Sequence, residues 1–317
     1  MSLLVGKTKY KLVRFSGILV LLGLWELLPG IGLIDAEILP RFSKVISTGI
    51  QMFLKEDLFM HAAVSLWRVL IGLFISAALA IPAGFVLGKW FPRVIPYLNP
   101  LFRVFGQVNP FSIMPVFILF FGIGETAKLA IVAWVCIWPI VFNTITGAQT
   151  VDAALVKSAK SLNIKPLDMI GKVLFPGAAP SIFLGLRVAV EMAFFMLMAG
   201  EMLGASAGLG YILHNAGHFF IAPKLYAAGL CIVLTGVALN RFLKFLERGI
   251  FFWRESLSVT EKLSGVKSTM RIGKPELAVI ALILAGLILV GTQQVQKANL
   301  EGTDPIHHMH AVEKTGE

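Results

Sequence analysis

Few residues in this chain have the types and spacing that chemistry requires. The clearest candidates are charged residues inside a long apolar segment, where Arg187, Glu191 and Glu201 lie. Such a charge costs about 2.5–3.5 kcal/mol in a lipid layer unless it faces protein or water. Arg187 and Glu191 are four residues apart and can form a structural pair on one helical face. Glu191 and Glu201 are therefore candidates for a polar path or gate, with a structural role as the alternative.

Other reactive groups lack the partners that a reaction or a metal ion needs. Cys136 and Cys231 lie in separate apolar runs, so we expect two buried free thiols. His214 and His218 share a helical face, but a pair without further ligands is not a metal site. The sequence contains no GxxxxGK[ST] phosphate loop. We therefore expect no catalytic residues, no metal and no cofactor in this chain.

The composition indicates a chain that is solvated by lipid. Apolar residues make up 57% of it and charged residues only 15%, and the mean hydropathy is +0.81. A soluble protein of this length needs more surface charge, and buried strands would give apolar runs of only about 4–8 residues. The apolar runs here approach the length of about 20 residues that spans a bilayer. The composition therefore predicts an all-α, polytopic membrane helix bundle.

Six membrane spans and a weaker seventh follow from these runs. The seventh is short for a span, so a helix lying in the membrane interface is the alternative there. The predicted spans are 14–31, 66–89, 101–121, 128–147, 182–203 and 225–245, with the seventh near 276–294.

The net charge of +10 predicts orientation. Basic residues gather at 7–14, 157–172 and 241–274, whereas the intervening loops 122–127 and 204–223 contain no Lys or Arg. Cytoplasmic loops of membrane proteins carry an excess of Lys and Arg. We therefore expect a cytoplasmic N-terminus and no nucleic-acid partner.

The polar stretch 148–181 has strong local signals for a helical elbow. Asp152 is a good N-cap, Asn163 tolerates the left-handed conformation that ends a helix, and Pro166 suits the first turn of the next. We expect Pro176 to end that second helix. Such an elbow between two spans can seat in a groove on another protein and pass force into the bundle. The alternative is an amphipathic loop that packs only on its own bundle.

The same stretch resembles the EAA loop of ABC importer permeases. In the run from Lys157 to Arg187, Ala159 takes the place of the second Ala of that motif, Asn163 that of its Gly, and Pro176 that of its Pro. Further pieces resemble the nitrate/sulfonate/bicarbonate/taurine branch of these permeases. They lie at 39–40, 65–72, 109–124, 143–147, 201–204 and 208–210.

Two positions depart from the motif: Lys157 stands in place of its Glu, and Ser158 in place of its first Ala. Because the charge at Lys157 is reversed, we expect a compensating acid on the ATPase partner. The resemblance assigns the coupling to an ATPase to Ser158, Ala159, Leu162, Asn163, Ile164 and Pro176.

The resemblance implies a subunit of a larger machine in the bacterial inner membrane. A separate ABC subunit would bind ATP and Mg²⁺, and a periplasmic or lipoprotein solute-binding protein would deliver a small solute. A second permease copy, most simply an identical one, would complete the path. The solute class implied is a nitrate-, sulfonate- or taurine-like anion. The chain itself would be a transport subunit and no enzyme.

The expected organisation has three parts. Residues 1–60 hold the first span and a periplasmic segment, 61–255 the permease core, and 256–317 an extension with a mobile tail. The tail carries a weak metal tract at His307, His308 and His310, for which an unliganded tail is the alternative. Two rival functions stay open: a gradient-driven secondary transporter or channel, and a membrane-embedded enzyme.

Overall fold

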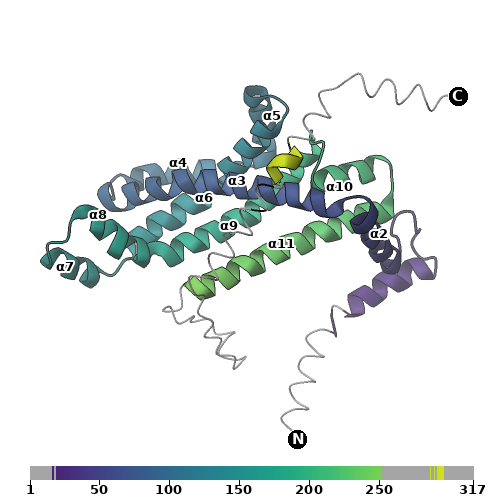
Figure 1. Ribbon diagram of the computed structural model, residues 1–317, viewed down its shortest axis with the longest axis horizontal. Helices are drawn as coiled ribbons and strands as arrows, with labels where there is room; N and C mark the ends of the chain where they lie inside the picture. The colour runs from purple at the N-terminus through teal and green to yellow at the C-terminus, as the bar shows by residue number, and fades with distance from the viewer. Residues whose placement is uncertain (1–15, 18, 251–285, 287–288, 290, 296–317) are drawn as a thin grey trace, which may run out of the picture.

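The computed structural model describes residues 16–17, 19–250, 286, 289 and 291–295, and every regular element in that part of the chain is a helix (Figure 1). A short apolar helix, Leu19–Gly30, comes first. The helices that follow are α2 (Phe42–Lys55), α3 (Leu58–Phe85), π-helix η1 (Val86–Trp90), α4 (Ile95–Gln107), α5 (Pro110–Phe121), α6 (Glu125–Gln149), α7 (Ala153–Ser161), α8 (Pro166–Met169), π-helix η2 (Ile170–Leu174), α9 (Phe175–Met202), α10 (Leu209–His218) and α11 (Ala222–Ile250).

Four continuous helices are long and apolar enough to cross a membrane. They are Leu58–Trp90, Glu125–Gln149, Ile170–Met202 and Ala222–Glu247. They confirm the predicted spans 66–89, 128–147, 182–203 and 225–245, although the first and third extend well beyond the predicted limits. The all-helical membrane fold expected from composition is therefore correct.

The predicted span 101–121 is divided between two helices, because the chain bends by 86° between α4 and α5; the pair forms either a broken span or a re-entrant loop. Pro110 follows Asn109, and a residue before proline is driven out of the helical region. Asn109 is accordingly extended, with φ −64° and ψ 116°, and its side chain accepts a hydrogen bond from the Phe111 amide (3.0 Å). Proline and cap together end one helix and begin another.

The first and seventh predicted spans are only partly covered by the described residues. Within 14–31 the structure has the helix Leu19–Gly30. Most of 276–294 lies outside the described residues, so that span stays a prediction, as do the expectations for the His-containing tail. Val295 is buried against Val64 and Trp67 of α3.

Helices α3, α6 and α9 form the core, and glycines allow them to approach closely. A Cβ added to Gly84 of α3 would lie 2.6 Å from the Cβ of Thr144, and one added to Gly185 of α9 would lie 2.7 Å from the Cβ of Asn143. Small residues at such contacts let helix backbones pack tightly in membranes. The core residues Val69, Cys136, Ile140, Ala189 and Leu197 are fully buried between these helices.

The core helices give the molecule two distinct ends. The elbow, residues 152–169, lies at one end, on the left of Figure 1, between the last turn of α6 and the first of α9. Towards the other end, which we call the charged end, Arg68, the eleventh residue of α3, pairs with Glu125 in the first turn of α6 and with Glu201 in the last turn of α9. Helices α2 and α10 also lie there (Figure 1).

Candidate functional site

The elbow is built by local capping. The Asp152 carboxylate accepts a hydrogen bond from the Ala154 amide (2.8 Å) at the start of α7. The helix ends at Ser161 with Leu162 as its C-cap, and Asn163 follows in the left-handed conformation with φ +53°. Pro166 then begins α8. The two short helices and the turn between them match the prediction from these residues.

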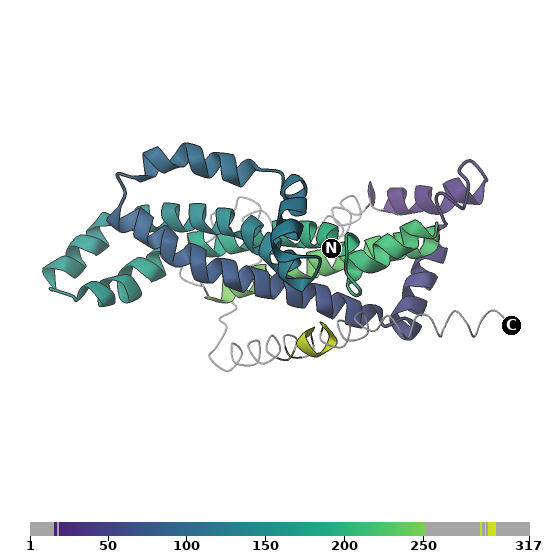
Figure 2. The ribbon, with the colours of Figure 1, turned by 90° about the horizontal axis from the view of Figure 1, so that it is seen from above.

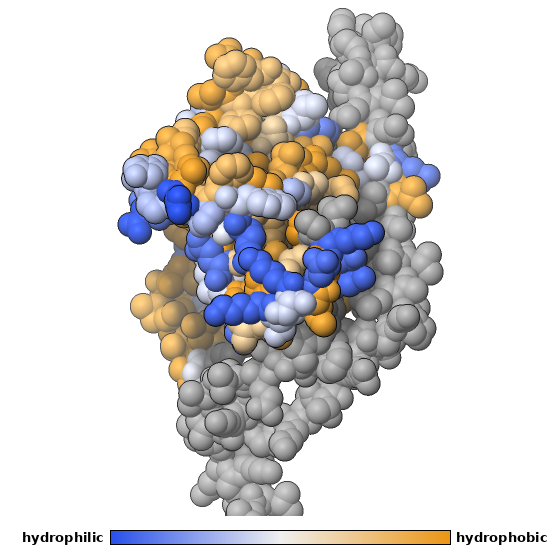
Figure 3. All heavy atoms as spheres, turned by 90° about the vertical axis from the view of Figure 1, so that its left-hand side faces the viewer, coloured by the Kyte–Doolittle hydropathy of each residue, from blue (hydrophilic) through white to orange (hydrophobic). Residues whose placement is uncertain are grey.

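The coupling residues implied by the resemblance are spread over the inner and outer faces of the elbow. Ala159 is buried, whereas Leu162 is 76% exposed. Ser158 and Asn163 are also exposed, and Ile164 is half-buried. Figure 3 views this end and shows hydrophilic side chains gathered on it, with hydrophobic residues around them. An exposed leucine at the tip of a polar elbow is available to a partner.

The structure corrects the expectation for Pro176. The chain does not stop there, because α8 continues through the π-helix η2 into α9, and Pro176 lies in the first turn of α9. The π-turn just before Pro176 places an extra residue within the continuous helix, which changes the hydrogen-bond register where the proline lacks an N–H donor. The second elbow helix is therefore joined rigidly to a membrane span.

The predicted pair between Arg187 and Glu191 is also wrong. Arg187 Nη1 lies 3.1 Å from Glu247 Oε2, and Glu191 Oε1 accepts a hydrogen bond from Asn240 Nδ2 (2.7 Å). Both partners belong to α11. The spacing of four residues is right for pairing, but the side chains reach the neighbouring helix instead and tie α9 to α11.

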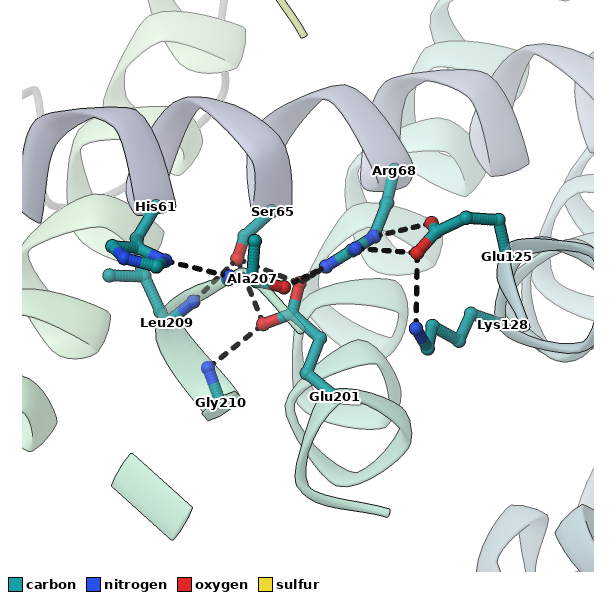
Figure 4. Close-up of polar contacts among 10 residues, drawn as sticks. His61, Ser65, Arg68, Glu125, Lys128, Glu201, Ala207, Leu209 and Gly210 are labelled. Atoms are coloured by element: carbon teal, nitrogen blue, oxygen red, sulfur yellow. Dashed lines mark hydrogen bonds and ion pairs between the residues drawn. The ribbon is translucent and has the colours of Figure 1, made fainter. Parts of the chain in front are cut away.

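Glu201 belongs to a buried charged cluster at the charged end, drawn in Figure 4. Arg68 of α3 donates from Nε and Nη2 to the two carboxylate oxygens of Glu125 (2.7 and 2.6 Å), and from Nη1 to Glu201 Oε1 (2.6 Å). Lys128 Nζ lies 3.1 Å from Glu125. Arg68 and Glu201 are each 1% exposed. Two cations and two carboxylates balance one another, which a buried ion network requires.

The cluster also holds the loop between α9 and α10. Ser65 Oγ donates to the Glu201 carboxylate (2.8 Å) and accepts from the Leu209 amide (2.9 Å). The Gly210 amide donates to Glu201 Oε2 (2.8 Å), and Arg68 donates to the Ala207 carbonyl (2.6 Å). A carboxylate at the first turn of α10 suits the helix dipole. The Glu201 carboxylate of α9 is thus enclosed and accepts hydrogen bonds from two other elements, α3 and α10.

This contact explains a glycine that the sequence alone leaves unexplained. A Cβ on Gly210 would lie 2.6 Å from the Met198 carbonyl oxygen and 2.7 Å from the Cβ of Glu201. Neither atom can move away easily, because one is backbone and the other is the root of a buried side chain. Gly210 is needed for close approach.

Sequence reasoning named Glu201 but missed its partners. A usable signal was present: Arg68 lies within a predicted span and Lys128 at the edge of another, and membrane charges require counter-charges. Which carboxylate serves which cation depended on the packing of α3, α6 and α9. A gate role for Glu191 or Glu201 stays a prediction. Among the described residues, no group of three or more His, Cys, Asp or Glu could hold a metal ion.

Bent apolar helices, a closed charged cluster at one end and an exposed elbow at the other define a multi-pass membrane transport protein. The chain belongs to the family of binding-protein-dependent transport system inner membrane components, whose model matches residues 80–252, more than half of its length. It is therefore the membrane-spanning permease subunit of an ABC importer and forms a path for a small solute.

Named relatives agree with this assignment. The taurine transport system permease protein TauC of Escherichia coli K12 is 29% identical over 239 residues, covering 74% of this chain and 86% of TauC. The nitrate import permease protein NrtB of Leptolyngbya laminosa is 28% identical over 255 residues, covering 77% of this chain and 89% of NrtB.

A solved structure agrees on the fold. A chain of the MetNI methionine ABC transporter, in an inward-facing conformation, superposes with a TM-score of 0.52 at 15% sequence identity. The match covers 58% of this chain and 92% of that one. At that identity the likeness concerns the fold alone.

Proposed function

We propose that two copies of this chain import a compact oxyanion, using ATP that a separate ABC subunit hydrolyses with Mg²⁺ while seated on the elbow. A solute-binding protein delivers the anion to the charged end. The elbow end faces the cytoplasm, and the N-terminus lies on the same side. The observation that carries the proposal is the exposed elbow with Leu162 at its tip.

The packing of the elbow supports a mechanical role. Val156 of α7 and Met169 of α8 pack against a buried cluster made of Phe85, Ala148, Leu174, Ala178 and Ile182. These residues belong to the elbow-end turns of α3, α6 and α9 and to η2. A displacement of the elbow therefore acts on all three core helices, because packed cores transmit strain.

The charge on the elbow supports an acidic partner surface. Lys157, Lys160 and Lys165 are exposed, whereas Lys172 pairs with Asp168 (2.9 Å). Among the described residues these three lysines have no ion-pair partner. Three such lysines around an exposed leucine suit a groove that is apolar at its centre and acidic at its rim. The compensating acid expected opposite Lys157 would lie on that rim.

The solute class is supported by the relatives. TauC is named for taurine and NrtB for nitrate, and taurine is an aminosulfonate. Both solutes are small and carry a planar or tetrahedral oxyanion group.

Replacing Leu162 with Asp tests the proposal. The new carboxylate would lose its hydration in an apolar groove, so copurification of the ABC subunit should fall about tenfold. ATP-driven uptake of taurine into proteoliposomes should fall in parallel. The matched control is Leu54→Asp, since Leu54 is 74% exposed on α2 at the charged end. The Leu54→Asp variant should copurify with the ABC subunit to the same extent as the unmodified chain.

The bent pair α4–α5 favours one rival function, a gradient-driven secondary transporter, because broken helices occur in such proteins. The uptake assay tests this rival as well. Uptake of taurine by the purified permease without any ATPase would overturn the proposal. So would equal ATPase copurification by Leu162→Asp and the unmodified chain.

A further inference from the structure

Helix α4 carries a polar stripe on an otherwise apolar surface. Asn99, Arg103 and Gln107 are spaced by four residues, so they lie along one side of the helix. All three are exposed. The adjoining face presents Tyr97, Leu101 and Val104, which are also exposed. Figure 2 shows α4 set apart from the rest of the bundle between its connections to α3 and α5.

Arg103 lies near the middle of the membrane-spanning bundle. Its neighbour Phe102 has its ring centroid 6.2 Å from that of Trp138 and 6.0 Å from that of Phe142, both on α6. Trp138 is thirteen residues after the start of α6 and eleven before its end, which places it about 20 Å and about 17 Å from those ends. Arg103 is therefore at a depth where lipid would be hydrocarbon.

Arg103 differs from Arg68 in having no counter-ion within the described part of the chain. Among the described residues, the ion pairs join other cations, and no carboxylate lies within pairing distance of Arg103. A cation facing hydrocarbon costs at least about 2.5–3.5 kcal/mol, so mid-membrane charges face protein or water. The space beside Arg103 must be filled by water, by an anion or by another chain.

The stripe ends at a cavity at the bend between α4 and α5. The cavity has a volume of about 400 Å³, and Gln107, Val108 and Asn109 line it together with Trp134 and Trp138. Irregular backbone at membrane depth is tolerated where it is buried in protein or lines a cavity. Gln107 is the member of the stripe that lines this cavity, and the other lining residues are mostly apolar. The broken backbone therefore borders open space next to the end of the stripe.

We propose that Asn99, Arg103 and Gln107 line the water-filled translocation path and that Arg103 binds the oxyanion group of the solute as it passes. This inference rests on the proposed function, because the second copy would close the path on its open side. A guanidinium offers a planar fork of donors that matches a sulfonate or a nitrate. The amides of Asn99 and Gln107 extend the row of donors along the helix.

Cysteine accessibility tests whether the stripe faces water. Arg103→Cys, Asn99→Cys and Gln107→Cys are made with Cys231 replaced by Ala, while the buried Cys136 stays. In membranes, each should react with sulfonatoethyl methanethiosulfonate at least about tenfold faster than Val104→Cys, whose parent side chain is 64% exposed on the apolar face. Equally slow reaction at both faces, or equally fast reaction, overturns the proposal.

Charge selectivity tests the role of Arg103. The Gln107→Cys thiol is modified by the anionic sulfonatoethyl reagent and by its cationic trimethylammonium analogue, with Arg103 intact and with Arg103→Gln. Loss of the guanidinium should lower the anion-to-cation rate ratio about tenfold. An unchanged ratio overturns anion binding by Arg103.

These measurements need neither ATPase nor a known solute. A failure of the stripe therefore leaves the elbow experiment unaffected. If the Leu162→Asp experiment fails while the stripe is reactive and selective for anions, α4 would still line an anion path, but the proposed coupling to ATP would be wrong.

Discussion

Two arginines in apolar helices have opposite environments. The Arg68 guanidinium donates hydrogen bonds to two carboxylates and a backbone carbonyl, and Arg68 is almost completely buried. Arg103 is exposed at mid-depth without a carboxylate among its described neighbours. The first is a structural group whose charge is already balanced. The second is available to an anion, so the same residue type has different consequences at the two positions.

Replacing Arg68 with Met should destabilise the protein strongly. Glu201 and Glu125 would lose their main counter-charge, and breaking one partner of a buried ion pair costs about 3–5 kcal/mol. Thermal unfolding of the purified permease in detergent measures the change. Arg103→Gln is the matched control and should unfold within a few degrees of the unmodified chain. Equal melting temperatures for Arg68→Met and the control would contradict the structural role of the cluster.

At the scale of helices, two local devices matter most. Glycines set the distance between core helices, as at Gly185, where a Cβ would also lie 2.9 Å from the Pro139 carbonyl oxygen. The left-handed turn at Asn163 sets the direction of the elbow. Both devices depend on one residue of a special kind, so each can be tested by a single substitution.

The variant Gly185→Ala should reduce stability by about 1–3 kcal/mol, because the methyl group overpacks a contact with backbone. Gly229→Ala in α11 is the control, since nothing lies within 4 Å of its added Cβ; there alanine favours the helix. Folded yield on size-exclusion chromatography and the melting temperature compare the two. Similar losses from both would argue against close packing of α6 and α9.

The variant Asn163→Gly should keep the elbow intact, whereas Asn163→Ile should damage it. Glycine adopts positive φ freely, and a β-branched side chain there is strongly disfavoured. Copurification of the ABC subunit should be retained by the first variant and fall severalfold in the second. Retention by both would show that the turn does not shape the docking surface.

At the scale of the molecule, the two ends have different chemistry. The elbow end has exposed lysines, and the charged end has a closed ion network with α2 packed nearby. Since α6 and α9 each run from one end to the other, these ends must face opposite sides of the membrane. By the positive-inside rule, the exposed lysines of the elbow support the proposed position of that end in the cytoplasm.

Labelling from one side tests this orientation. The variant Lys55→Cys at the end of α2 should react with a membrane-impermeant maleimide in intact spheroplasts. Lys160→Cys in α7 should react only after the membrane is opened. Both parent residues are exposed lysines, so access alone should separate them. The reverse pattern would invert the proposed topology and the site of the ATPase.

Sequence by itself determined the features that depend on neighbouring residues. Hydropathy placed four continuous spans correctly, since a span is a local run of apolar residues. Asp152, Asn163 and Pro166 specified the elbow because caps and left-handed turns act within one helical turn. Pro176 misled for a related reason: a proline near a helix start can also continue a helix through a π-turn.

Only the tertiary structure decided which distant residues meet. Arg187 reaches Glu247 instead of Glu191, and Arg68 joins Glu125 to Glu201, because the rotation and relative height of packed helices select the partners. The depth of Arg103 depends on how α4 packs against Trp138 of α6. Such contacts are set by long-range packing between helices, which no spacing within a single helix encodes.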